Sequence, residues 1–152
     1  MKSLRSIFYP ARFFTQKQDK QIIEAIKEAE MDTSGEIRVH FQKKLKGNVF
    51  DAAVDTFYKL KMDETKEKNG VLFFFVPSKR QFAIIGDEGI NSMVPENFWD
   101  EIKSILESGF KSGKKVESIC EAIKMAGEKL KHFFPYKKIY DINELPDEIS
   151  FS

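Results

Sequence analysis

The sequence predicts an α/β domain, a three-layer α/β/α sandwich around a small mixed sheet that includes a β-hairpin. Helical and strand periods alternate along the chain, which is typical of α/β folds. A continuous apolar run over residues 71–76 indicates a buried central strand. A polar turn and a second apolar run follow it, as in a hairpin. An α+β arrangement with every helix on one face is the alternative, because the last predicted helix is long.

The first expected element is a helix that begins near Thr15. Its apolar residues Ile22, Ile26 and Ala29 recur at helical spacing. A strand over residues 36–41 follows, in which apolar and polar residues alternate. Alternation predicts one wet face, so we expect this strand to lie near an edge of the sheet.

The remaining elements follow from the same periods and from helix-breaking residues. A second helix is expected over residues 50–64, and the hairpin turn over residues 77–80. A third helix over residues 95–109 is expected to stop at Gly109. A fourth helix over residues 114–134 is expected to end before Pro135.

Length and composition indicate one domain. The 152 residues show no interior linker, so we assign an N-terminal arm to residues 1–14, the domain to 15–135 and an irregular tail to 136–152. The apolar share of 41% suffices for a core without disulfides or metals. Any bound ion would therefore be functional.

Charge and cysteine content exclude several partners. A net charge of +1 gives no long-range attraction for nucleic acid. The single Cys120 forms no internal disulfide, which suits the cytoplasm. No apolar run reaches the ~20 residues that a membrane-spanning helix needs, and no secretory signal is evident, so we expect a soluble protein. Aromatic residues 9–14 could contact a membrane or a protein partner, or simply pack on the domain.

Acidic residues are predicted to converge at one end of the sheet. If strands 36–41 and 71–76 are parallel, their N-terminal ends share an edge, and the hairpin returns the chain to that edge. The predicted metal ligands are the acidic residues that this topology places there: Asp32, Glu36, Asp63, Asp87 and Glu88.

A calcium ion would relieve the repulsion among these carboxylates, because Ca²⁺ takes six to eight oxygen ligands, including backbone carbonyls. Gly86 and Gly89 would let the loop turn its carbonyls inward. The alternative is a solvated turn, since Asp and Gly are common turn formers. Asp32 begins the segment DTSGE, which resembles half of a calcium loop but is more typical of a helix-to-strand turn.

Other catalytic patterns are weak, and the sequence assigns no catalytic residue. His40 and His132 have no metal-binding context, which favours surface histidines. Cys120 lies on the apolar stripe of the fourth helix, which favours a buried thiol over a nucleophile. The glycines of ESGFKSGKK lack the spacing of a phosphate-binding loop.

The segments SGEIRVHF, KNGVLFFFVPSKRQFAIIGDEGI, VPENFWDEI and FKSGKKVESICEAI together resemble the TPM domain family, the module of thylakoid lumen acid phosphatase and photosystem II repair proteins. The chain looks like a soluble, stand-alone bacterial member. The resemblance covers residues 15–134 and implies an α/β/α sandwich whose acidic loop residues bind divalent cations, notably calcium.

Carried over by position, the ion site of the resemblance would be Asp87, Glu88 and Gly89, with Glu36 and Asp32 as neighbours. The commoner family loop looks like Gly-Tyr-Gly-Leu-Glu, so two acids here replace its first two places. We therefore expect a divalent-cation-binding domain with Ca²⁺, or another ion such as Mg²⁺, as its cofactor. The alternatives are a metal-dependent acid phosphatase, which the resemblance also implies, and a non-catalytic protein-interaction module.

Overall fold

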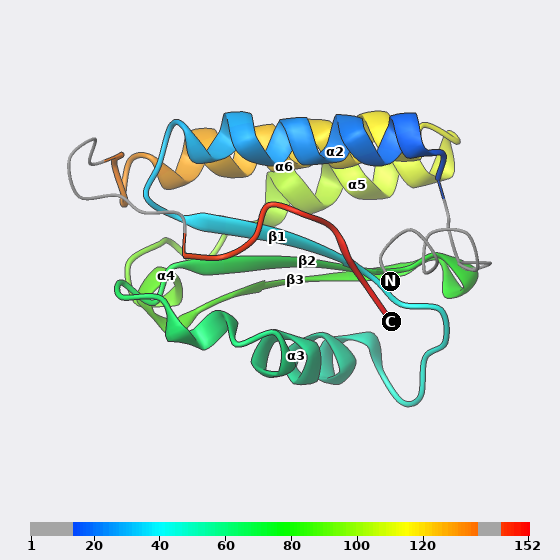
Figure 1. The fold of residues 1–152 in the computed structure, drawn as a ribbon, viewed down its shortest axis with the longest axis horizontal. Coiled ribbons are helices and arrows are strands. Elements are labelled where there is room, and N and C mark those ends of the chain that lie inside the picture. Colours follow the sequence, from blue (N-terminus) through cyan, green and yellow to red (C-terminus); the bar gives the residue numbers. More distant parts are fainter. Residues whose placement is uncertain (1–13, 137–143) are drawn as a thin grey trace.

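A computed structural model of the chain describes residues 14–136 and 144–152, and these form one mixed four-stranded sheet between two helical layers (Figure 1). The strand order is β3-β2-β1-β4. The strands are β1 (Glu36–Phe41), β2 (Gly70–Val76), β3 (Gln81–Gly86) and β4 (Ser150–Phe151). β1 and β2 are parallel, and β2 and β3 form the predicted antiparallel hairpin.

Helices cover both faces of the sheet, which confirms the predicted α/β/α sandwich and rules out the α+β alternative. In Figure 1, α2, α5 and α6 lie above the sheet and α3 lies below it. The helices are α2 (Gln16–Glu30), α3 (Val49–Lys59), α4 (Glu88–Asn91), α5 (Asp100–Lys111) and α6 (Lys115–Leu130). Two short 3₁₀ helices, η1 (Met62–Glu64) and η2 (Pro77–Lys79), precede β2 and β3.

Helix α2 begins where the sequence predicts. The Thr15 hydroxyl accepts a hydrogen bond from the Gln18 backbone N–H, and the Gln18 side chain accepts one from the Thr15 backbone N–H. This capping box satisfies two of the donors that a helix N-terminus otherwise leaves without partners. The predicted apolar residues Ile22, Ile26 and Ala29 are buried.

Two separate cores lie on the two faces of the sheet. β2 is buried along its whole length, as its continuous apolar run predicts. Because side chains alternate along a strand, Phe73 and Phe75 join the core under α2, α5 and α6, whereas Leu72 and Phe74 join the core over α3.

The second, third and fourth predicted helices differ from the structure at their ends, and the fourth, predicted to residue 134, ends at Leu130. The second is interrupted at Lys61, whose φ of 58° is left-handed, and η1 follows. The third begins at Asp100 and continues past Gly109, where the sequence predicts a stop. A Cβ on Gly109 would lie 2.1 Å from the Cβ of Ser118, so the glycine allows α5 to pack closely on α6.

The predicted irregular tail needs correction at its C-terminal end. Residues 150–151 form β4, which pairs in parallel with β1, and Leu145 and Ile149 are buried. β1 is therefore an inner strand with every residue buried, and the expectation of a wet strand near an edge is wrong. The polar side of β1 is covered by the end of the chain itself.

Two features of the prediction fall on or near undescribed residues. Apart from Phe14, the predicted N-terminal arm lies outside the described residues, as do residues 137–143 of the tail.

Over the described part of the chain, no helix has the length and apolar character needed to cross a membrane.

Candidate cation site at the rim of the sheet

The predicted shared rim exists at the N-terminal end of β2. The Glu36 N–H donates to the Asn69 carbonyl at 3.2 Å, and the Asp87 N–H donates to the Gly70 carbonyl at 3.0 Å. The start of β1 and the end of β3 therefore flank the start of β2. In Figure 1 this rim is the end of the sheet beside α4.

Asp87 is a buried carboxylate at this rim. It precedes α4, and its Oδ1 accepts a hydrogen bond of 2.7 Å from the Glu88 N–H. Its side chain is only 7% exposed, and Oδ2 is buried without a hydrogen-bond partner among the described residues. Burial raises the pKa of Asp87, while the Glu88 N–H and the charge of Lys68 act in the opposite direction.

The segment between α3 and β2 brings a second carboxylate to Asp87. The negative charges of Glu88 and then of Asp63 raise the pKa of Asp87. Lys68, which has a left-handed φ of 52°, donates from Nζ to the Asp63 carbonyl. An ammonium group thus lies among these acidic groups, where it offsets part of their charge.

Backbone carbonyls also lie at the rim, beside Gly89. A Cβ placed on Gly89 would be 2.2 Å from the Glu67 carbonyl oxygen and 2.5 Å from that of Lys68. No side chain fits there. Neither Gly86 nor Gly89 is among the glycines with positive φ, so the loop does not need them for a left-handed backbone. Gly89 is instead required by close approach.

The same segment is tied to the turn before β1. Glu67 Oε2 accepts hydrogen bonds from Ser34 Oγ at 2.8 Å and from Asn69 Nδ2 at 3.1 Å. Thr33 Oγ1 donates to the Phe134 carbonyl. DTSGE is therefore a helix-to-strand turn with partners on both sides, and its Asp32 is exposed.

The predicted ligands divide into groups. Asp87 and Asp63 lie at one side of β2, and Glu36 begins β1 at its other side. Glu88 and Asp32 are exposed. Within residues 14–136 and 144–152, no group of three acidic, histidine or cysteine side chains is placed to hold a metal ion. Any ion at Asp87 therefore needs carbonyl or water oxygens as well.

Glu36 belongs to a different acidic group, which the sequence analysis did not foresee. Its Oε1 accepts a hydrogen bond from the Leu145 N–H, and burial together with Glu144 raises its pKa. Glu30 Oε2 accepts from the Ile37 N–H at 2.8 Å. Burial, and then Asp147, raise the pKa of Glu30 to about 9. The alternation of EISFS at residues 148–152 was the available signal that the chain's end joins the sheet.

The expectation that both histidines lie on the surface is half right. His132 is exposed, but His40 is only 3% exposed. Its ring stacks on Phe74, and its nitrogens hydrogen-bond Ser150 Oγ and Ser152 Oγ, each at 2.7 Å. Burial, with a smaller effect of Arg38, lowers the pKa of His40 to about 4. A neutral, fully bonded imidazole of this kind is structural.

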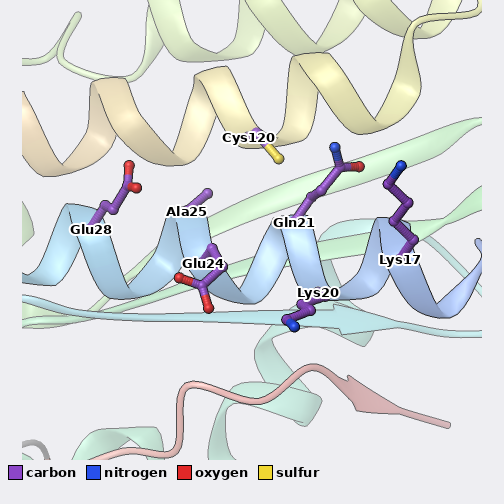
Figure 2. Close-up of a pocket in the computed structure, with 7 residues that line it drawn as sticks. All are labelled: Lys17, Lys20, Gln21, Glu24, Ala25, Glu28 and Cys120. Atoms are coloured by element: carbon purple, nitrogen blue, oxygen red, sulfur yellow. The ribbon is translucent and has the colours of Figure 1, made fainter.

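Cys120 lies in a shallow groove between α2 and α6 (Figure 2). Its thiol points toward α2, between Gln21 and Ala25. The residue is half-buried, and burial, with Glu117 and Glu28, raises the pKa of the thiol. A thiol with a raised pKa is a poor nucleophile at neutral pH, but the predicted burial of Cys120 is only partial.

A phosphate clamp is not assembled around Asp87. Arg38 lies on β1, where its Nε is buried without a hydrogen-bond partner among the described residues, and Glu148 is the charge that acts on it. Arg80 lies at the turn between β2 and β3, the opposite end of the hairpin. Neither arginine is among the charges that act on Asp87.

The fold and the rim define an α/β/α domain with a buried acidic residue in the loop after its hairpin. The model of the TPM domain matches residues 7–129, and the chain belongs to the TPM domain family. This confirms the resemblance. A search of curated proteins found no match.

Solved structures share the fold. The NMR structure of the BA42 protein from the psychrophilic bacterium Bizionia argentinensis is 44% identical, with a TM-score of 0.88, and the match covers 93% of this chain and 97% of that one. The N-terminal domain of the cg2496 protein from Corynebacterium glutamicum is 14% identical (TM-score 0.62, coverage 79% and 75%). The N-terminal domain of a P. gingivalis protein is 16% identical (TM-score 0.63, coverage 82% and 81%). The last two matches show the fold alone.

Proposed function

We propose that this protein binds a divalent cation at the rim of the sheet beside Asp87, and that calcium is the preferred ion. The observation that carries the proposal is the Asp87 Oδ2 atom, which is buried and has no partner among the described residues. A buried carboxylate oxygen without a partner is costly, and a hard cation is the ligand that satisfies it best.

The surrounding oxygens suit calcium better than zinc. Asp87 and Asp63 would supply carboxylate oxygens, and the carbonyls of Glu67 and Lys68 lie against Gly89 in the same loop pair. Zinc prefers histidine and cysteine, whereas Ca²⁺ accepts carbonyls and waters in flexible geometries. Membership of the TPM family supports the proposal, because the family resemblance implies acidic loop residues that bind divalent cations.

The charge of the site sets the expected affinity. Two carboxylates are few for a calcium site, and the ammonium of Lys68 is already among them. Few charged ligands give weak sites, so we expect a dissociation constant on the order of 10⁻⁴ to 10⁻³ M. The bound ion would supply positive charge to Asp87 and would displace Lys68 from the acidic groups. We place this function in the cytoplasm, as the lone thiol suggests.

Thermal unfolding tests the proposal. At a calcium concentration ten times the dissociation constant, binding stabilises the folded state by about 1.4 kcal/mol, which raises the melting temperature by a few degrees. Asp87→Asn keeps the size of the side chain and its bond to the Glu88 N–H but removes the charge, so this variant is expected to lose the calcium response.

The matched control is Glu88→Gln, because Glu88 is the exposed neighbour of Asp87. This variant is expected to keep most of the response. A response that is equal in wild type and Asp87→Asn, or absent from wild type at 10 times the weakest expected dissociation constant, would exclude the site. Magnesium, measured in the same way, shows which ion the loop prefers.

A further inference from the structure

A groove lies along the open edge of the sheet, at the other end of the hairpin from Asp87. It has a volume of ≈ 930 Å³ and runs beside the first residues of β3, between the start of α3 and the end of α5. Its apolar lining includes Phe50, Phe82, Ile84 and Phe110, and Phe50 is 59% exposed. These side chains give the groove an apolar lining, as binding sites commonly have.

Strand β3 offers backbone hydrogen-bonding groups to this groove. β3 is the last strand in the order β3-β2-β1-β4, so only β2 pairs with it among the described strands. The Asp87 N–H donates to the Gly70 carbonyl. In an antiparallel pair, every second residue exchanges hydrogen bonds with the neighbouring strand, so on this side of the hairpin residues 87, 85, 83 and 81 face β2 with their backbone groups. The N–H and C=O groups of Phe82 and Ile84 therefore point away from β2. Gly86, in the same phase, has its carbonyl bonded to Asn91 Nδ2 from outside the sheet.

The side chains that border the groove carry an excess of positive charge. Four basic side chains line it against one acid, Glu107; the basic residues are Arg80, Lys103, Lys111 and Lys115. Lys103, Glu107 and Lys111 follow one another at intervals of four residues on α5, which places them on one face of the helix. Because the whole chain has a net charge of only +1, this is a local excess of positive charge.

We infer that this groove binds an extended acidic segment of a partner protein, which adds to β3 as a fifth strand. A strand laid along Phe82 and Ile84 would receive main-chain hydrogen bonds, the source of affinity in β-strand addition. Its alternate side chains point to opposite faces. Acidic residues on one face would lie toward Lys103 and Lys111, and apolar residues on the other would lie toward Phe50.

Charge separates this occupant from two others. A second copy of the chain, paired edge to edge, would bring the basic side chains of two grooves together. Residues 1–13 carry three basic residues and no acid, so they are also a poor match for a basic groove. An acidic partner is the occupant that charge complementarity selects.

The test uses a blocked octapeptide of alternating glutamate and valine, Ac-EVEVEVEV-NH₂, added to the full chain and followed by NMR. The expected result is binding that weakens with salt, with the amides of Phe82 and Ile84 becoming protected from hydrogen exchange. The double variant Lys103→Glu/Lys111→Glu is expected to bind about tenfold more weakly, since each exposed pair contributes a factor of a few. Lys17→Glu on α2, which is exposed and does not line the groove, is the matched control and should bind within about twofold of wild type.

Two control peptides separate strand addition from charge alone. Methylation of alternate backbone nitrogens keeps the charges but removes the donors, so it should abolish binding; equal binding of the methylated peptide would overturn the proposal. Equal binding of the lysine–valine octapeptide would overturn it as well. So would binding to anionic phosphatidylserine vesicles without binding to the peptide, or protection of Phe82 and Ile84 in the free protein that rises with its concentration and so indicates self-pairing.

Discussion

Gly89 shows how one missing side chain shapes the candidate site. Its Cα lies against the carbonyls of Glu67 and Lys68, and those carbonyls come from the segment that also carries Asp63. The glycine is therefore what lets the loop after β3 and the segment before β2 meet. A sequence shows that a glycine is present, but it does not show whether conformation or space requires it.

Gly89→Ala tests this reading. The new Cβ would overlap two backbone oxygens that cannot rotate away, so we expect a loss of about 1–3 kcal/mol in the free energy of unfolding, measured by urea titration. The displaced segment should also lose its response to calcium. The control is Gly47→Ala: it strains a backbone with φ of 74° but contacts nothing, so it should lower stability and keep the calcium response. Equal calcium responses in the two variants would contradict this reading.

Glu30 makes the stability of the domain depend on pH. Its pKa is about 9 in the folded protein, against an ordinary value of 4.5, so the folded state keeps a proton that the unfolded chain releases. The contribution of Glu30 to stability is therefore complete below pH 4.5 and declines as the pH rises toward 9.

Glu30→Gln should remove this decline. Glutamine keeps an acceptor for the Ile37 N–H and does not ionise, so at pH 8 the variant should be more stable than wild type by roughly 2 kcal/mol, a value reduced for partial solvent screening. At pH 5 the two should be nearly equal. Urea titrations from pH 5 to 9 measure the difference, and the exposed Glu24→Gln serves as control. Parallel pH profiles for Glu30→Gln and wild type would show that Glu30 is ionised in the fold.

At the scale of elements, the last residues of the chain change the character of β1. The Ser152 N–H donates to the Phe41 carbonyl at 3.0 Å, and the Lys43 N–H donates to the Ser152 carbonyl at 2.9 Å. The same residues supply both hydroxyl partners of His40. The alternating sequence of β1 predicts that its polar residues face water. In the structure, the two-residue strand β4 and Ser152 cover one of them, His40.

Deletion of residues 150–152 should expose His40. The deletion returns solvent to the ring and also removes both hydroxyl partners. Because burial is the main cause of the lowered pKa of His40, we expect this pKa to rise from about 4 toward the ordinary value of 6.5. An NMR titration of the imidazole measures the change. The double variant Ser150→Ala/Ser152→Ala, which keeps β4 but removes the hydroxyls, separates the two causes. A pKa that stays near 4 after deletion would mean that β4 does not bury His40.

The elements predicted from sequence are those with strong local signals. The helical spacing that begins near Thr15 and the apolar run of β2 are sufficient by themselves, and the structure confirms both. The continuation of α5 through Gly109 was not predictable, because it depends on Ser118 of a different helix. The interior position of β1 was missed for a similar reason, since it depends on residues more than 100 positions later.

At the scale of the molecule, the topology predicted that the carboxylates share one end of the sheet, but not which of them lie together. A parallel crossover and a hairpin place Glu36 and Asp87 at the same end of the sheet, as expected. β2 lies between them, however, and the Glu36 carboxylate accepts a hydrogen bond from the Leu145 N–H instead. Pairing of strands can be inferred from apolar patterns, whereas the partner of each carboxylate depends on loops whose course the sequence does not dictate.

The two proposed binding surfaces lie at opposite ends of the hairpin. The proposed cation site is at the end of β3, and the groove proposed to bind a peptide is at its beginning. The two proposals depend on different residues, so a variant at Asp87 should leave peptide binding intact.

The most direct measurement of the central claim is a residue-resolved NMR titration of the full chain with Ca²⁺ up to 10 mM. The account predicts saturable shifts in the amides of residues 86–91 and of Asp63 to Lys68, all with one dissociation constant, and their loss in Asp87→Asn. Shifts centred on Glu36 and Leu145, or no saturable shift at any of these residues, would contradict it.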